Sequence, residues 1–531
     1  MMEHNEFNWI IPERGMYASD VRSNLESTLQ ILRKNYKNVI TIWDHDFNTS
    51  FESPYTISCY QLMNPEDCFY GGRTEVFQMY ANAKKLKKEI HYYDVTSLYP
   101  SVYAHYPLPV GNPNHLVGTN IDMRRFHPTA SDRYYGFARV KVVPRKSDMI
   151  GLLPQRDASS GRLFFPVYPM EGCWGTEELY LAMQNGYVVE QVYELYEWDD
   201  RNRSSCHFAA YVNYFFQLKQ EAEGWKKLGA SSDSPSEEEQ NQLVESLYIQ
   251  NGNLAKIRPH KVRKNAVLRS LAKLYLNSLW GKFAQKSAKT QHTTIYGTQQ
   301  FLSLWNHKQV DQSSCKFREI SPGVYKTSYN VKNEFISPVR HGNLFIAAKV
   351  TETARCVLHR KMLDVGPENI IYCDTDSIIF LYSSIMGILT DVGLGKWTNE
   401  YPSHVIEHVY ALAPKLYSLK LKLRNEDPYE VFRAKGVQMT LVNQERMVFE
   451  SVKPLIENIV KGINHHFTIP VKNFTIFSNS GNSALPYGQV YSRYNEKKVR
   501  AIITKRLFCL DPDLSWENCS QIRTYPFGYE V

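Results

Sequence analysis

The stretch that decides the fold runs from residue 371 to residue 378 and reads Ile371-Tyr372-Cys373-Asp374-Thr375-Asp376-Ser377-Ile378. Its apolar and β-branched residues predict a strand, and two carboxylates two positions apart interrupt them. In an extended segment residues i and i+2 point to the same side, so we expect Asp374 and Asp376 to face one point in space. Two buried like charges that lie close together are costly unless a cation lies between them. The pattern therefore predicts a site for a hard divalent cation, and a surface hairpin turn is the alternative interpretation.

A third carboxylate stands at the end of another predicted strand, in the stretch Tyr92-Tyr93-Asp94-Val95-Thr96-Ser97-Leu98-Tyr99-Pro100-Ser101. The apolar strand ends at Asp94, and a turn then leads into a short predicted helix. Together with the acidic pair, Asp94 completes the ligand set of a two-metal site. In such a site one ion activates the attacking oxygen and the other stabilises the leaving oxygen.

Basic and amide side chains follow one face of a helix predicted from about Val262 to Lys286, in which no Gly or Pro occurs before Gly281. They recur every four residues and therefore form one slowly drifting stripe. Because the helix contains no acidic residue, its own side chains cannot pair with these cations. We expect the stripe to bind a triphosphate, with a solvated basic face as the alternative for Arg258, Arg263 and Lys264. The residues of the stripe are Lys261, Asn265, Arg269, Lys273 and Asn277.

The charge distribution of the whole chain agrees with a phosphate-binding helix. The 531 residues contain 62 Lys+Arg and 54 Asp+Glu, a net charge of +8. The window from Ser246 to Val310 holds 11 of the basic residues and no acid, so the remainder has 51 basic and 54 acidic residues. No apolar run reaches membrane-spanning length and the N-terminus does not resemble a signal peptide, so we expect a soluble intracellular protein without a membrane partner. Nine cysteines without a C-x-x-C pair argue against a disulfide framework and a zinc ribbon.

The order of predicted elements indicates a mixed α+β protein of several subdomains. Two helical patterns, His207 to Lys227 and the one ending near Gly281, flank the Ser/Glu-rich stretch Ala230 to Gln240, which we expect to be a solvated loop. A further helix is expected from Asn343 to Leu363. Strands are predicted at Tyr135 to Val143, Tyr187 to Tyr196, Ile371 to Tyr382 and Ala434 to Val442.

The three segments, in this order, resemble the D-x-x-S-L-Y-P, K-x-x-x-N-S-x-Y-G and Y-x-D-T-D-S motifs of family B DNA polymerases. The resemblance extends from about Cys68 to the C-terminus and is closest to the protein-primed branch, which includes adenovirus, small-phage, linear-plasmid and Maverick/Polinton-type enzymes. Local matches add to it. They are Phe69-Tyr70-Gly71-Gly72-Arg73, Trp174 to Leu179, Asn185-Gly186-Tyr187, Leu218-Lys219-Gln220-Glu221-Ala222, Ala413 to Tyr417, Ala434-Lys435-Gly436 and Thr524 to Tyr529.

The resemblance implies a role for each matching residue. Asp94, Asp374 and Asp376 would be the catalytic carboxylates, with Asp94, Asp376 and the Val95 carbonyl as ligands of two Mg²⁺ ions, for which Mn²⁺ could substitute. Tyr99 would be the gate against ribonucleotides. Nucleotide-binding residues would be Ser97, Leu98, Tyr99, Lys261, Arg269, Lys273, Asn277 and Trp280. DNA-binding residues would be Gly71, Gly72, Arg73, Ser278, Gly281, Tyr372, Thr375 and Lys435.

The resemblance also implies a right-hand architecture of α+β class, with a palm, two-helix fingers, a β-rich thumb and insertions between the motifs. The expected function is template-directed addition of dNTPs to a primer hydroxyl, with primer-template DNA as partner, a terminal priming protein as a candidate partner, and a monomeric chain. The nucleus is one candidate compartment. The expected parts are an upstream remnant (1–66), palm (67–110 and 342–433), an insertion that receives a priming protein (111–206), fingers (207–286, with a loop at 228–260), a second insertion (287–341), and thumb with C-terminal tail (434–531).

Departures from the family pattern leave two other hypotheses open. Trp280 and Phe69 stand where the family has Tyr, and no exonuclease motifs precede residue 67; Asp44 and Asp46 are interpreted as a strand end and turn. One alternative is a catalytically silent, DNA-binding relic. The other is a zinc peptidase, since His404-Val405-Ile406-Glu407-His408 matches H-x-x-E-H on an expected helix.

Overall fold

The computed structural model describes residues 10–11, 16–35, 63–286, 288–336, 342–383, 393–423, 428–437, 441–460, 466–476, 490–501, 505–508 and 521–530. The chain divides into two compact units, Met1–Leu62 and Met63–Val531. The described residues of the first unit form a short hairpin and a helix, and Asp44 and Asp46 lie outside them. Its elements are β1 (Ile10–Ile11), β2 (Met16–Tyr17) and α1 (Ala18–Asn35).

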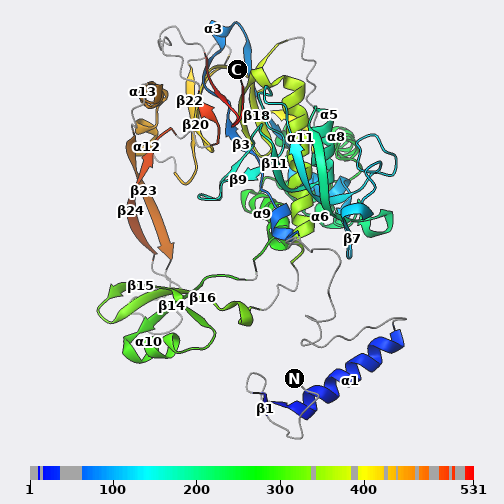
Figure 1. The fold of residues 1–531 in the computed structure, drawn as a ribbon. Coiled ribbons are helices and arrows are strands. Elements are labelled where there is room, and N and C mark those ends of the chain that lie inside the picture. Colours follow the sequence, from blue (N-terminus) through cyan, green and yellow to red (C-terminus); the bar gives the residue numbers. More distant parts are fainter. Residues whose placement is uncertain are drawn as a thin grey trace. The chain divides into compact units, whose positions relative to one another are not determined.

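The second unit is built around a five-stranded antiparallel sheet in the order β19-β5-β18-β17-β3 (Figure 1). Its central strand β18 is buried on both faces. Ile378 and Phe380 pack in one core with Leu358 of helix α11, whereas Ile379 and Leu381 pack in another core formed with a second sheet. This double burial explains the unbroken apolar run that the sequence shows here. The elements are β3 (Thr74–Val76), β5 (Glu89–Val95), β17 (Ile370–Asp374), β18 (Ser377–Tyr382), β19 (Trp397–Asn399) and α11 (Leu344–Val365).

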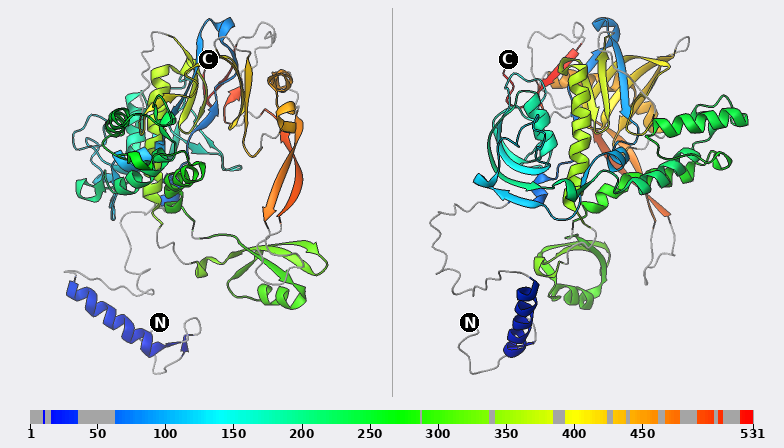
Figure 2. Two further views of the ribbon diagram at one scale, coloured as in Figure 1. Left: turned by 180° about the vertical axis from the view of Figure 1, so that it is seen from behind. Right: turned by 90° about the vertical axis from the view of Figure 1, so that its right-hand side faces the viewer.

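The predicted helix Asn343 to Leu363 is confirmed as α11, whose first turn is capped by the Asn343 side chain. Figure 2 shows α11 between the central sheet and a four-stranded sheet in the order β11-β8-β12-β7. That sheet shares a continuous core with the central one, so the expected insertion 111–206 is packed onto the body of the protein. Its elements are β7 (Asn114–Val117), β8 (Gly136–Val143), β11 (Met170–Gly175), α5 (Thr176–Gln184) and β12 (Val188–Glu197).

A six-stranded sheet, β22-β21-β20-β4-β26-β25, covers the other side of the central sheet. Two expectations are wrong here. The C-terminal tail, expected with the thumb, returns to pair with β4 next to the central sheet. The segment from His404 to His408 starts a strand rather than a helix, so its residues lack the spacing on a helix that the zinc hypothesis requires. The elements are β4 (Gln78–Asn82), α3 (Ala83–Leu86), β20 (His404–Ala413), β21 (Leu416–Leu423), β22 (Tyr429–Ala434), β25 (Leu507–Phe508) and β26 (Gln521–Tyr525).

Helices α6 and α9 pack against each other and against α4, which follows the first motif. The expected loop at 228–260 is wrong in its middle, because α8 begins after Ser236, whose hydroxyl caps the helix by accepting from the Glu239 amide. Three glutamates in its first turn favour this helix start, which the low-complexity composition concealed. The helices are α4 (Leu98–His105), α6 (Ala209–Glu221), α7 (Trp225–Leu228), α8 (Glu237–Gln250) and α9 (Ala266–Phe283).

The other described elements are peripheral. A three-stranded sheet, β14-β16-β15, carries helix α10, and β23 and β24 form a long hairpin. No helix among the described residues is long and apolar enough to cross a bilayer. These elements are β14 (Gln291–Tyr296), α10 (Gly297–Trp305), β15 (Val310–Ser321), β16 (Val324–Val331), α12 (Leu441–Arg446), α13 (Phe449–Val460), β23 (Phe467–Ile476) and β24 (Val490–Val499). Short pairs and 3-10 turns complete the set: β6 (Leu108–Pro109), β9 (Gln155–Arg156), β10 (Leu163–Phe164), β13 (Arg203–Ser204), η1 (Pro65–Cys68), η2 (Gly118–Asn120), η3 (Asp200–Asn202), η4 (Pro259–Lys261), η5 (Asn333–Phe335) and η6 (Pro367–Asn369).

Candidate active site

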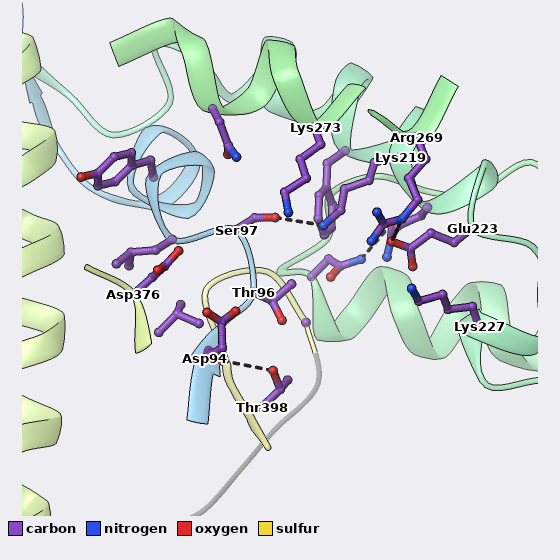
Figure 3. A pocket seen from close by; sticks show the side chains of 18 of the residues that line it. Asp94, Thr96, Ser97, Lys219, Glu223, Lys227, Arg269, Lys273, Asp376 and Thr398 are labelled. Atoms are coloured by element: carbon purple, nitrogen blue, oxygen red, sulfur yellow. Dashed lines mark hydrogen bonds and ion pairs between the residues drawn. The ribbon is translucent and has the colours of Figure 1, made fainter. Parts of the chain in front are cut away.

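A cavity of about 710 Å³ lies between the end of the central sheet and helices α6 and α9. Asp94, at the end of β5, and Asp376, in the turn between β17 and β18, both line it. The two residues are tied through the backbone, because the Val95 amide donates a 2.7 Å hydrogen bond to the Asp376 carbonyl. β5 and β18 pair with Asp94 opposite Ser377. Figure 3 shows both carboxylates at the same end of the cavity.

The turn that carries Asp376 is tight and packs against the segment that contains Gly72 and Arg73. Thr375 adopts a left-handed conformation with φ of 60°, and its amide donates a 2.6 Å hydrogen bond to the Arg73 carbonyl. A Cβ atom on Gly72 would lie 2.7 Å from Thr375 Cγ2, so this position needs glycine. Asp374 ends β17 and Asp376 lies in the turn before β18, so the expectation of one extended strand is wrong.

This turn separates the two carboxylates of the motif. Asp374 does not line the cavity, and its Oδ1 accepts from Lys415 Nζ at 2.7 Å and from Thr74 Oγ1 at 3.0 Å. Tyr372, buried beneath it, donates to Asp374 Oδ2 at 3.4 Å and accepts from the Lys415 amide at 2.8 Å. Asp374 is thus a paired carboxylate beside the site.

The pKa values of the carboxyl groups Asp94 and Asp376, which line the cavity, are raised. Burial, followed by the charges of Asp376 and Glu400, raises the pKa of Asp94 to about 7. Burial, followed by the charge of Asp374, raises the pKa of Asp376 to about 6. Such a pair of oxygen donors, each destabilised by the negative charge of a neighbour, fits a hard divalent cation. Among the described residues no cluster of three His, Cys, Asp or Glu side chains that could hold a metal is found.

Cations line the opposite wall. Lys273 and Arg269 come from α9, and Lys219 comes from α6, with its Nζ donating a 3.1 Å hydrogen bond to Ser97 Oγ (Figure 3). Burial, together with the charges of Arg269 and Lys273, lowers the pKa of Lys219. Arg269 forms an ion pair with Glu223, Nε to Oε1 at 3.0 Å. This wall has the charge and donors to bind phosphate groups next to the carboxylates.

An aromatic group closes one side of the cavity. The Tyr99 and Trp280 rings pack edge to face at 5.3 Å between centroids, and Phe69 lies 6.1 Å from Trp280 on its other side. Burial raises the pKa of Tyr99 to about 12, so its hydroxyl is protonated at neutral pH. The two departures from the family motif, Phe69 and Trp280, therefore meet in one cluster.

Most of the nucleotide-binding residues expected from the sequence meet at this cavity. The residues that line it are Asp94, Val95, Ser97, Leu98, Tyr99, Arg269, Lys273, Asn277, Trp280, Thr375 and Asp376. Lys261 does not belong to the stripe, because it lies in η4 and α9 begins only after Asn265, the residue that caps it. The expectation that Asn265 continues the stripe as a ligand is also changed, since its side chain accepts from the Leu268 amide.

The DNA-binding residues expected from the sequence lie outside the cavity, apart from Thr375. Two of them are wrong as contact residues. Arg73 is fully buried and pairs with Glu75 at 2.8 Å, and Tyr372 is fully buried beneath Asp374. Gly71 accepts from Arg355 at 3.0 Å, and Ser278 donates to the Tyr275 carbonyl at 3.3 Å. Gly72, Ser278, Gly281 and Lys435 keep some or full exposure and stay candidates.

Twelve lining residues had no role in the sequence analysis, among them Lys219, Glu223, Lys227, Thr398 and Glu400. A signal existed for Lys219, since it lies in a stretch that matches the family. Glu223 follows the last residue of α6 by two positions, in the turn that leads to α7, whereas Arg269 and Lys273 lie four residues apart on α9. Thr398 lies in β19 and Glu400 directly follows it, and only the pairing of β19 with β5 brings both to the site.

Comparisons with known proteins agree with this geometry. A family model described as DNA polymerase type B, organellar and viral, matches residues 60–230 and 240–380, more than half of the chain. A probable DNA polymerase of Podospora anserina is 26% identical over 385 residues, covering 71% of this chain and 28% of the relative. One from Neurospora intermedia is 24% identical over 392 residues, covering 70% and 32%. The chain thus spans about a third or less of the length of these curated relatives.

Among solved structures, phi29 DNA polymerase complexed with primer-template DNA and incoming nucleotide substrates is 15% identical to this chain. The match has a TM-score of 0.49 and covers 82% of this chain and 62% of the phi29 chain.

Proposed function

The chain belongs to the organellar and viral type B DNA polymerases, and from that premise we propose that its cavity adds dNTPs to a primer hydroxyl as directed by a DNA template. The observation that carries the proposal is the arrangement of opposite charges across one cavity. Asp94 and Asp376 lie at one end, and Lys219, Arg269 and Lys273 line the facing helices. A metal-bound triphosphate has the complementary charge pattern, with phosphates that need both cations and metal ligands.

Membership of this family implies dependence on a divalent metal in general. We propose that Asp94, Asp376 and the Val95 carbonyl hold two Mg²⁺ ions, with Mn²⁺ as a substitute. When bound there, the ions would supply charge neutralisation at the attacking and leaving oxygens. A raised carboxylate pKa favours this use, since a cation replaces the proton that Asp94 binds up to about pH 7 and Asp376 up to about pH 6.

The side chains around these carboxylates would orient the nucleotide. Lys219 and Lys273 would bind its phosphates and withdraw charge as pyrophosphate leaves. Tyr99 would lie under the deoxyribose, where its ring, held against Trp280, leaves no room for a 2′-hydroxyl. Asn277 and Trp280 would face the nascent base pair from α9.

These roles suggest which elements form the palm, fingers and thumb subdomains. We place the palm in the central and six-stranded sheets, the fingers in α6 to α9, and the thumb in α12, α13, β23 and β24. Primer-template DNA would be the partner, with Gly72, Thr375 and Lys435 as contacts. A terminal priming protein is proposed for the sheet at 111–206, from family resemblance alone.

The direct test is extension of a primed template by the purified chain with Mg²⁺ and dNTPs. We expect template-dependent addition that stops when Mg²⁺ is chelated. Binding of primer-template without any addition, in wild-type protein that is folded, would instead support the silent DNA-binding relic. Addition of one nucleotide to a candidate priming protein in place of the DNA primer would test protein priming separately.

A further inference from the structure

One acidic side chain lies among the cations on the wall of the cavity that faces Asp94 and Asp376. Glu223 lines the cavity together with Lys219, Arg269 and Lys273, and its side chain is only 16% exposed. Its Oε1 lies 3.0 Å from Arg269 Nε (Figure 3). The other acids that line the cavity, Asp94, Asp376 and Glu400, come from the sheet side. Glu223 therefore places a negative charge on the side of the cavity where the phosphates are proposed to bind.

A second ion pair nearby shows what a purely structural pair looks like. Glu221, the last residue of α6, is 3% exposed and accepts from Arg258 Nε at 2.8 Å, from its Nη2 at 2.9 Å and from its backbone amide at 3.0 Å. Glu221 does not line the cavity. The Glu223 pair differs in every respect, because a single guanidinium nitrogen bonds to it, and both partners border the space where phosphates would lie.

The pairing leaves Arg269 only partly available to a ligand. A guanidinium has five N–H donors in a fixed fork, and a phosphate is best bound by two parallel ones. While Nε donates to Glu223, the edge that includes Nε is occupied. A phosphate that takes this edge must displace the carboxylate, and Glu223 then faces the anion without its partner.

We propose that Glu223 is a gate on Arg269: its carboxylate holds the guanidinium when the cavity is empty, competes with the outer phosphates of a bound nucleotide, and speeds the departure of pyrophosphate. The inference rests on the proposed function and assigns Glu223 a positioning role that acts through Arg269. With this pair in place the cavity would still bind a triphosphate, because the triphosphate also contacts Lys273 and the metal-binding carboxylates. The affinity of the cavity for pyrophosphate, the smaller product, would be lower.

The test is calorimetric titration of the full chain with inorganic pyrophosphate in the presence of Mg²⁺. Glu223→Gln keeps the size of the side chain and removes its charge, so we expect pyrophosphate to bind about 3- to 10-fold more tightly. In steady-state extension the same variant should be inhibited by lower pyrophosphate concentrations and show a lower KM for dNTP together with a lower kcat. Glu221→Gln is the matched control, expected to lower thermal stability without changing pyrophosphate affinity.

The route through Arg269 is tested by combining substitutions. In an Arg269→Gln background, Glu223→Gln should change pyrophosphate affinity less than twofold. An equal effect in both backgrounds, or unchanged affinity in folded Glu223→Gln protein, would overturn the gate. If Glu223→Gln does not fold, Glu223→Asp, which shortens the reach to Arg269, should give a smaller tightening, and unchanged affinity would again count against the gate.

Lys273→Ala separates the two levels of inference. Weaker pyrophosphate binding in Lys273→Ala, with no effect of Glu223→Gln, would remove the gate and leave the proposed function standing. Pyrophosphate binding that is insensitive to Lys273→Ala would count against the proposed function itself.

Discussion

Asp374 and Asp376 are two residues apart on one hairpin, yet their side chains lie in different surroundings. Asp376 lines the cavity with Asp94, and repulsion adds to burial in raising its pKa to about 6. Asp374 lies beside the cavity, where Lys415 and Thr74 bond to it. The comparison teaches that a buried carboxylate with a raised pKa is poised to bind a cation, whereas one that already bonds to a lysine and a hydroxyl supports the hairpin.

The largest effect is expected for Asp376→Asn, which removes the carboxylate on the cavity side. We expect nucleotide incorporation to fall by about 10³-fold or more, because the amide cannot replace an anionic metal ligand. Binding of primer-template should change little. Single-turnover extension and a DNA-binding titration measure the two properties, and incorporation within tenfold of wild type would contradict the two-metal assignment.

The lysines on the two sides of the hairpin give the next largest contrast. Lys273→Ala should raise the KM for dNTP by about 10- to 100-fold, since it removes a charge-assisted contact to phosphate. Lys415→Ala should leave that KM within about twofold, because Lys415 pairs with Asp374 outside the cavity. Steady-state kinetics over a dNTP series compares the two, and an equal rise in both variants would remove the distinction.

The pKa of Asp94 gives a third contrast, in stability. Its folded-state pKa of about 7 exceeds the ordinary value of 3.8, so the folded protein binds the proton more tightly than the unfolded chain does. The resulting stability is present below pH 4 and is lost as pH rises through 7. In chelator, Asp94→Asn should match wild type near pH 4 and exceed it by about 1–2 kcal/mol at pH 8, a value reduced for solvent screening.

Thermal unfolding at several pH values measures this effect. Added Mg²⁺ should stabilise the wild-type protein more at pH 8 than at pH 5.5, since the cation competes with the proton. The Asn variant should lose most of that gain. A difference in stability between the two proteins that does not change with pH would show that the pKa of Asp94 is not raised in the folded protein.

The smallest effect is expected for Asp374→Asn. The substitution weakens a partly exposed ion pair with Lys415, whose side chain is 43% exposed, so stability should fall by about 0.5–1 kcal/mol. Incorporation should fall by about tenfold at most, because the hairpin keeps its backbone bond to Arg73. A loss as large as that of Asp376→Asn would place Asp374 among the metal ligands and end the contrast between the two sides.

Much of the site could be predicted from local sequence. The helix after Asn265 has a capping side chain, no internal Gly or Pro before Gly281, and Arg269 and Lys273 four residues apart, all of which act over one or two turns. The apolar run around Asp376 predicted buried strand structure, but not the turn that divides it into β17 and β18. The same local rules failed for His404 to His408, because strand pairing overrode a pattern that also fits a helix.

The sequence by itself determined the residue types and order of the site: an acid at a strand end, a basic helix without acids, and an acidic pair in an apolar run. These depend on neighbours within a few positions. Three features follow from tertiary packing alone: Asp376 and not Asp374 lines the cavity, Glu223 in the turn after α6 pairs with Arg269 of α9, and the C-terminal strand returns to β4. The physical reason is that charge pairing and strand pairing join residues tens to hundreds of positions apart, which no local periodicity records.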